Sequence, residues 1–172
     1  FEESDWSYVA GRLLMMEAER EVYHSRGFSY DNFPKTIRKM VEFGLYDKRL
    51  LSYTEEELNQ ITQLIDINRD MVYDYAGAHM FVNRYLIKHD GKTYELPQET
   101  FMAISMMLAL NEKEGETRVE IVKEFYNALS LRKLSLATPI LANLRIPDGN
   151  LSSCFITAID DNIESIFYNI DS

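Results

Sequence analysis

The chain has 172 residues, a length typical of one domain or of one domain and part of another. It carries 18 Lys and Arg against 28 Asp and Glu, so its formal net charge of −10 argues against a basic surface for nucleic acid and against attraction to an anionic membrane. Hydrophobic residues make up 46% of the chain, which excludes wholesale disorder. The single cysteine, Cys154, excludes an internal disulfide and a zinc site built from several thiolates.

Helical patterns dominate the first half of the chain. Residues 5–26 predict a helix that Asp5 caps and Gly27 ends. The side chains that recur at spacings of three and four, and so share one face of this helix, are Val9, Leu13, Met16, Arg20 and Tyr23. Pro34 and Gly44 are typical of the start and the end of a second helix.

A capping signal and a turn signal follow. Thr54 and Glu57 have the spacing of a capping box, in which each side chain accepts a hydrogen bond from the backbone N–H of the other residue. Asp90-Gly91 predicts a hairpin between residues 85–87 and 93–95. The other expected helices lie over residues 69–82, 98–111 and 116–131.

The pattern changes near residue 133. Pro139 and Pro147 exclude long helices in the stretch that follows, and residues 154–159 predict a buried strand. Asp160-Asp161-Asn162 then offer caps for a helix over residues 163–170. We therefore predict a mainly α chain, in which a helical domain with one β-hairpin precedes the first strands and helix of an α/β domain.

Three features carry candidate chemistry, and each has a plain structural alternative. Cys154 could be a redox or nucleophilic thiol, or an inert buried cysteine. The Thr138 hydroxyl could bind phosphate oxygens, or belong to a Thr-Pro turn. The residues 160–162 could meet an anion or a ribose hydroxyl, or simply cap a helix. Spacing alone favours the plain alternative in each case.

No other pattern adds a site. The three histidines lack the spacing of metal ligands, so we expect no metal site; they are His24, His79 and His89. The glutamates of residues 55–57 and 112–116 are typical of solvated faces or caps. The chain has no glycine-rich phosphate loop, no apolar run long enough to span a membrane and no basic signal segment at its start. We therefore expect a cytoplasmic protein that binds neither membrane nor nucleic acid.

Three sequence elements are specific when taken together. They are S-L-A-T-P-I over residues 135–140, S-S-C over residues 152–154, and D-N-I-E-S-I over residues 161–166. With them the chain resembles the large catalytic subunit of ribonucleotide reductase. Upstream stretches that agree with the class I enzymes are 46–47, 50–51, 53–57, 69–70, 75–76 and 125–130, so the resemblance covers residues 5–170.

The resemblance implies an activity and the residues that serve it. The complete protein would reduce the ribose 2′-hydroxyl of ribonucleoside diphosphates by radical chemistry, for the synthesis of DNA precursors. Cys154 would be the first member of a redox-active cysteine pair, on the first strand of an α/β barrel. Thr138 would contact the substrate diphosphate, and Ser153 would lie against the substrate ribose.

The resemblance also implies partners and domain limits. A dNTP specificity effector would bind at Asp161, Asn162 and Ile163, and the helix over residues 163–170 would join two copies in a homodimer. A separate metal-containing small subunit would generate the radical, and thioredoxin or glutaredoxin would reduce the disulfide, so this chain itself would hold no cofactor. Residues 1–27 would close an ATP-binding effector region, residues 28–133 would form the helical domain, and residues 134–172 would begin the barrel.

We expect this sequence to be a piece of a longer protein, since it starts at Phe1 and stops inside an expected helix. The partner cysteine, the radical cysteine and the catalytic glutamate of the family would lie elsewhere, so the piece alone is predicted to be inactive. Two alternatives stay open at this point: a non-catalytic helical interaction module, and one half of a split gene product that is completed in trans.

Overall fold

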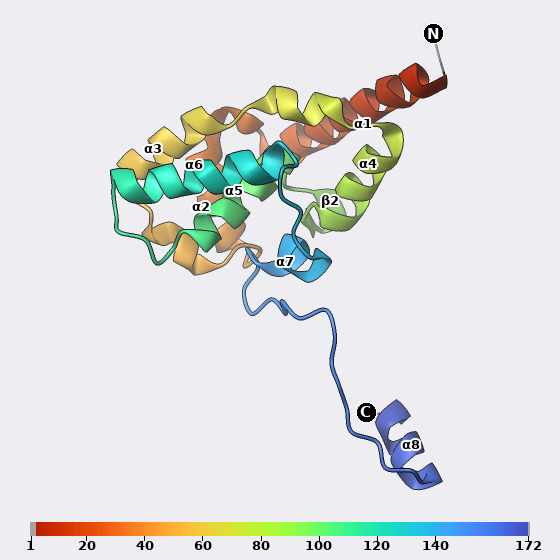
Figure 1. Cartoon of the computed structure of the whole chain (residues 1–172). Helices are drawn as coiled ribbons and strands as arrows, with labels where there is room; N and C mark the ends of the chain where they lie inside the picture. Colours follow the sequence, from red (N-terminus) through yellow and green to blue (C-terminus); the bar gives the residue numbers. More distant parts are fainter. Residues whose placement is uncertain (1–2, 172) are drawn as a thin grey trace.

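The computed structural model describes the backbone of residues 3–171 and the side chains of residues 5–168. It is mainly helical with one short hairpin, which confirms the predicted fold class for the helical part (Figure 1). The α-helices are α1 (Glu3–Arg26), α2 (Phe33–Glu42), α3 (Glu55–Leu64), α4 (Tyr75–Met80), α5 (Pro97–Leu108), α6 (Glu116–Ser130), α7 (Thr138–Asn143) and α8 (Ile163–Asp171). The shorter elements are the 3-10 turns η1 (Tyr30–Asn32), η2 (Lys48–Ser52) and η3 (Ile67–Val72), the π-helical turn η4 (Phe81–Tyr85), and the strands β1 (Lys88–His89) and β2 (Lys92–Thr93).

Helix α5 is the centre of the helical body. All of its side chains but the last are buried, including Met102, Ile104 and Met106, which are fully enclosed. Because α5 is buried on every side, other elements have to cover it, and α6, η2 and η3 pack against it. Burying each large apolar side chain stabilises the fold by about 1.5–3 kcal/mol, so this helix accounts for much of the core.

Helix α1 packs through a face of small and medium residues. Met15, Ala18 and Val22 are buried, and a Cβ on Gly11 would stand 2.3 Å from the carbonyl oxygen of Tyr73. Glycine at this position therefore allows α1 to lie directly against the backbone that enters α4. The face that the sequence spacing identified points the other way, because its members Val9, Leu13, Met16, Arg20 and Tyr23 are all exposed.

The local signals in the sequence give the expected cap and turn, but the hairpin strands are Lys88–His89 and Lys92–Thr93, not residues 85–87 and 93–95. Thr54 and Glu57 form the predicted capping box at the start of α3. Asp90 and Gly91 both have positive φ, at 49° and 75°, as a two-residue hairpin turn requires, and the strands pair with Lys88 opposite Thr93.

Two predicted elements are wrong. The helix expected over residues 69–82 is divided, because the Asp74 side chain accepts a hydrogen bond from the backbone N–H of Gly77 and starts α4 only at Tyr75. Residues 154–159 form no strand and are exposed, not buried. A strand needs a neighbouring strand for its backbone hydrogen bonds, and the described residues supply none beside this segment. The start of a barrel and the domain limits at residues 27 and 133 stay predictions.

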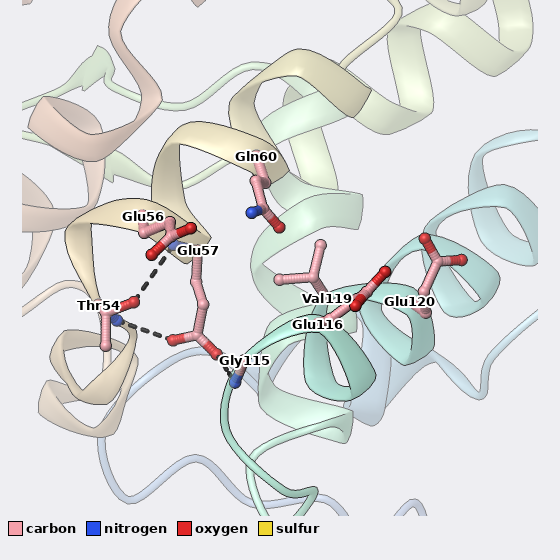
Figure 2. Close-up of a pocket in the computed structure, with 8 residues that line it drawn as sticks. All are labelled: Thr54, Glu56, Glu57, Gln60, Gly115, Glu116, Val119 and Glu120. Carbon is pink, nitrogen blue, oxygen red and sulfur yellow. Dashed lines mark hydrogen bonds between the residues drawn. The ribbon is translucent and has the colours of Figure 1, made fainter.

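Buried Arg–Glu pairs join segments that lie far apart in the sequence. Arg118 and Glu57 link α6 to α3, and Figure 2 shows Glu57 accepting from the backbone N–H groups of Thr54 and Gly115. Arg26 Nη2 lies 2.6 Å from Glu99 Oε1 and links the end of α1 to α5.

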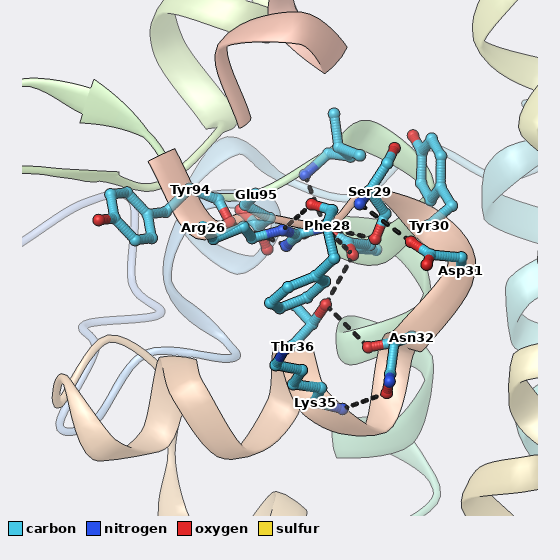
Figure 3. Close-up of polar contacts among 12 residues, drawn as sticks. Arg26, Phe28, Ser29, Tyr30, Asp31, Asn32, Lys35, Thr36, Tyr94 and Glu95 are labelled. Carbon is cyan, nitrogen blue, oxygen red and sulfur yellow. Dashed lines mark hydrogen bonds and ion pairs between the residues drawn. The ribbon is translucent and has the colours of Figure 1, made fainter. Parts of the chain in front are cut away.

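The Arg26 side chain also fixes the turn that follows α1. Its guanidinium donates to the carbonyl oxygens of Phe28, Ser29 and Tyr94 (Figure 3). No buried side-chain nitrogen or oxygen lacks a hydrogen-bond partner in the described part of the chain, as stable burial of charge requires. None of the helices described here is both long enough and apolar enough to cross a membrane.

The Glu57 pair predicts how stability depends on acid. Burial alone would raise the pKa of Glu57, but hydrogen bonds from Arg118, Gly115 and Thr54 outweigh it and lower the pKa to about 2. Because the folded pKa lies below the unfolded value of about 4.3, this stability is present above pH 4.3 and is lost as the pH falls towards 2. We predict that Glu57→Gln lowers the free energy of unfolding by about 3 kcal/mol at pH 7, and that this difference shrinks towards pH 2.

Urea unfolding at pH 7, 4 and 2.5 measures the effect. Glu56→Gln is the matched control, because Glu56 is the exposed neighbour of Glu57. Its small effect should not change with pH, whereas an equally constant difference for Glu57→Gln would show that the buried carboxylate is not what titrates.

Candidate functional site

The segment that carries the sequence elements of residues 135–140, 152–154 and 161–166 begins beside the helical body. Residues 134–137 have no regular structure, and Thr138 opens the six-residue helix α7 with Pro139 in its first turn. The Thr138 side chain is exposed, and its Oγ1 lies 3.5 Å from the hydroxyl of Tyr85 at the end of η4. The position of Thr138 therefore depends on how α7 is held against η4.

Arg145, which follows α7, holds this segment on the body. Its side chain is fully buried, with Nε 2.6 Å from Glu95 Oε1 and Nη2 2.7 Å from Glu95 Oε2. Nη1 donates to the carbonyl oxygens of Leu141 and Ala142 in α7, and Nη2 donates to that of Tyr85. One guanidinium thus binds α7, η4 and the short stretch between β2 and α5 that carries Glu95.

Glu95 has further partners that keep it in place. The Tyr46 hydroxyl donates to Glu95 Oε1 over 2.5 Å, and the backbone N–H of Ile87 donates to Oε2 over 3.1 Å. Burial and the adjacent Glu95 charge raise the pKa of Tyr46 well above its usual value, so Tyr46 stays a neutral donor. Although burial would lower the pKa of Arg145, the negative charge of Glu95 outweighs it and raises that pKa.

An apolar pocket of about 350 Å³ lies next to this anchored segment. Its wall combines Tyr85 of η4, Phe101 of α5 and the unwound residues Leu134, Ser135 and Leu136. A larger pocket of about 530 Å³ lies between α3 and α6 and is lined by Glu56, Glu116 and Glu120 (Figure 2). None of the predicted site residues lines either pocket, and α7 contributes only Leu141 to the wall of the apolar one.

Ser153 and Cys154 lie in an exposed stretch without regular structure. Ser153 Oγ is 3.8 Å from Cys154 Sγ, and both side chains are exposed. The Cys154 thiol is therefore not buried in the described structure, and its redox role stays a prediction. No hydrogen bond between described residues joins Thr138 to Ser153 or Cys154.

The predicted effector residues lie at the start of α8. The Asn162 side chain accepts a hydrogen bond of 2.8 Å from the backbone N–H of Ser165, so it caps the helix, and Asp161 and Ile163 are exposed. Figure 1 shows α8 away from the helical body, at the end of the extended segment that carries Cys154. The three effector residues are thus together, but they lie apart from Thr138.

Sequence reasoning missed Arg145, Glu95 and Tyr46. One signal was available, because Arg145 is the single charged residue in the otherwise apolar or small stretch 137–147. A lone charge in such a stretch indicates either a solvated turn or a buried residue with a partner. Only the structure shows that the partner lies 50 residues earlier in the chain.

Comparisons with known proteins bear on what this segment is. Residues 71–149 match the model of the ribonucleotide reductase all-alpha domain. The ribonucleoside-diphosphate reductase subunit alpha of Synechocystis sp. is 43% identical over 168 residues, covering 98% of this chain and 21% of the relative. Those of Enterobacteria phage T4 and Escherichia coli are 39% and 36% identical, over 96% and 94% of this chain and 22% and 21% of the relatives.

The chain is related to the large subunits of ribonucleotide reductase. It spans about a fifth of the length of the curated relatives it matches. The match to the all-alpha domain includes α7 and Arg145, so the anchored segment lies within the region that is similar to that domain.

The anchor predicts which part of the chain depends on Arg145. Arg145→Lys keeps the positive charge but cannot reproduce the bidentate pair with Glu95 together with the three carbonyl contacts. We predict that hydrogen exchange of the Leu144 and Asp47 amides becomes at least tenfold faster, because Leu144 N–H bonds within α7 and Asp47 N–H donates to the Arg145 carbonyl.

The matched control is Arg118→Lys, which changes the corresponding buried pair between α3 and α6. It should speed exchange at Gly115, whose N–H donates to Glu57, and leave Leu144 unchanged. Equal effects of the two variants on Leu144 would mean that the whole body loosens and that Arg145 has no local role.

Proposed function

We propose that this chain forms part of a ribonucleoside-diphosphate reductase large subunit that converts ribonucleotides to deoxyribonucleotides. The observation that carries the proposal is the 43% identity over 98% of the chain, together with the presence of the Thr138, Ser153 and Cys154 elements within the aligned length.

The proposed chemistry balances with Cys154 as one of two thiols. Replacing the ribose 2′-hydroxyl by hydrogen releases that hydroxyl as water and needs two electrons and two protons. Two thiols supply both when they join in a disulfide. Cys154 is the only cysteine in this sequence, so the second thiol has to come from outside these 172 residues. A radical generated on a separate metal-containing subunit would start each turnover, and thioredoxin or glutaredoxin would restore the thiols.

Two hydroxyls would position the substrate. The Thr138 Oγ1 would donate to an oxygen of the diphosphate, and Ser153 would lie against the ribose. Arg145 and Glu95 would act through α7, as positioning residues that fix where Thr138 begins the helix. Closing the site would require the 151–159 stretch to move towards α7 or to be ordered by chain outside these residues, because the described arrangement keeps them apart.

Helix α8 would provide regulation and assembly. Asp161, Asn162 and Ile163 would bind a dNTP specificity effector, with the negative Asp161 on its sugar or base and not on its phosphates. The apolar side chains of α8 would pack in a homodimer through residues 163–170, and Ile163, Ile166 and Phe167 are 72%, 42% and 65% exposed. The side chain of Ile170 lies outside the described ones. ATP would act at the region that residues 1–27 close.

Substitution of Cys154 in the complete subunit tests the proposal. We predict that Cys154→Ser abolishes multiple turnover of a ribonucleoside diphosphate with thioredoxin as reductant, because no disulfide can form, while the fold is retained. Ser152→Ala, two residues earlier in the same exposed stretch, is the matched control and should keep most of the activity. The 172-residue chain alone should give no turnover.

Each outcome separates the proposal from its alternatives. Unchanged turnover by Cys154→Ser would refute the role of Cys154. No deoxynucleotide from the wild-type complete subunit with its radical-generating partner would favour a non-catalytic helical interaction module. Activity that appears only after a second polypeptide is added would indicate a split protein completed in trans.

A further inference from the structure

Asp70 in η3 is a buried carboxyl group with neutral partners. Its side chain is 4% exposed. Oδ1 accepts a hydrogen bond of 2.7 Å from Gln98 Nε2, and Oδ2 is bonded to the Tyr30 hydroxyl. The neighbouring Arg69 directs its guanidinium elsewhere, towards Asp66, Asn127 and Ser130. Among the contacts of the described residues, Asp70 therefore has no cation beside it that would compensate a negative charge.

The other buried acidic residues of the described chain each have a positively charged partner. Glu57, Glu95 and Glu99 each form an ion pair with an arginine, and Asp47 forms one with Arg49. A buried carboxylate without such a partner is costly, whereas a protonated carboxyl can both donate and accept hydrogen bonds with neutral groups. Tyr30 and Gln98 are neutral and both donate to Asp70, so neither supplies the positive charge that the arginines give the other buried acids.

Asp70 is also the hub of a hydrogen-bond network. The Tyr30 hydroxyl, on Oδ2, accepts from the backbone N–H of Gln98 over 3.3 Å. Gln98 Oε1 accepts from the Tyr126 hydroxyl over 2.7 Å, and that hydroxyl accepts from the backbone N–H of Asp66 over 3.0 Å. The network joins η1, η3, α5 and α6, and Tyr30 also lines a cavity of about 600 Å³ at the surface.

We propose that Asp70 is a proton-operated latch, which when protonated holds η1 and η3 against α5 and α6 and which loosens them when it loses its proton. Ionised Asp70 would place an uncompensated charge among Tyr30, Gln98 and Tyr126, and the turn η3 is the element able to carry it to solvent. The latch is independent of the proposed reductase activity, since none of its residues lies in the predicted substrate or effector sites.

The charged groups around Asp70 favour its protonated form. Glu99 of α5 and Glu19 of α1 face it with negative charge, and Arg69 is turned away. Burial, with these two carboxylates, raises the pKa of Asp70 to about 7 despite hydrogen bonds from Tyr30 and Gln98. Since the folded pKa exceeds the unfolded value of about 3.9, the latch is fully present below pH 3.9, and its stabilisation is lost as the pH rises to 7.

A carboxyl ¹³C titration of the full chain by NMR is the direct test. The Asp70 Cγ resonance should titrate with a midpoint near pH 7, and the unfolding equilibrium constant of the wild type should rise about tenfold per pH unit between pH 5 and 6.5 relative to that of Asp70→Asn. Asp66→Asn is the matched control in the same turn. It loses the negative charge that pairs with Arg69, keeps an oxygen that can cap η3, and should leave this pH dependence intact, because the pKa of Asp66 is lowered, not raised.

Two backbone amides report on the latch itself. The backbone N–H of Asp66 donates to the Tyr126 hydroxyl, and that of Gln98 donates to the Tyr30 hydroxyl. The hydrogen-exchange protection of these two amides should therefore fall between pH 6 and 8 in the wild type and stay constant in Asp70→Asn. A Cγ midpoint near pH 4, or protection of both amides that does not change with pH in the wild type, would overturn the proposal. The wild-type measurements stand even where Asp70→Asn fails to fold.

Discussion

The buried ion pair between Arg145 and Glu95 holds helix α7, which Thr138 opens, against the helical body. Helix α7 has six residues, too few to be stable alone, and its side chains are only partly covered. Arg145 compensates by binding two carbonyl oxygens of α7 and the carbonyl of Tyr85 while it pairs with Glu95. The position of Thr138, and with it the proposed diphosphate contact, depends on this one side chain.

Buried Arg–Glu pairs also occur elsewhere in the helical body, and one buried acid of the described chain, Asp70, has no such pair. Arg26–Glu99 and Arg118–Glu57 also join segments that are far apart in the sequence, while α5 supplies the apolar core between them. Each such pair requires both of its partners, because either one left alone would be an unpaired buried charge. Asp70 lies at an equivalent junction without an arginine, and protonation there takes the place of a counterion.

Features that depend on a few neighbouring residues could be predicted from the sequence, whereas packing partners could not. The capping box at Thr54 and the turn at Asp90-Gly91 are set by local chemistry, and both are present. Helix α1 has apolar residues on two faces, and Gly11 decides which one packs by admitting the backbone at Tyr73. The strand expected over residues 154–159 lacks a partner strand, and the Arg145–Glu95 pair spans 50 residues, so neither outcome was visible in local patterns.

A double-mutant cycle on Arg145 and Glu95, read by urea unfolding, tests the central claim most directly. Arg145→Met and Glu95→Gln should each lower the free energy of unfolding by about 3–5 kcal/mol, because each leaves the other partner as an unpaired buried charge. The double variant should cost less than the two together, with a coupling energy of about 2–3 kcal/mol, and should still lose protection of the α7 amides. Additive effects, or α7 amides that stay protected in the double variant, would contradict the account.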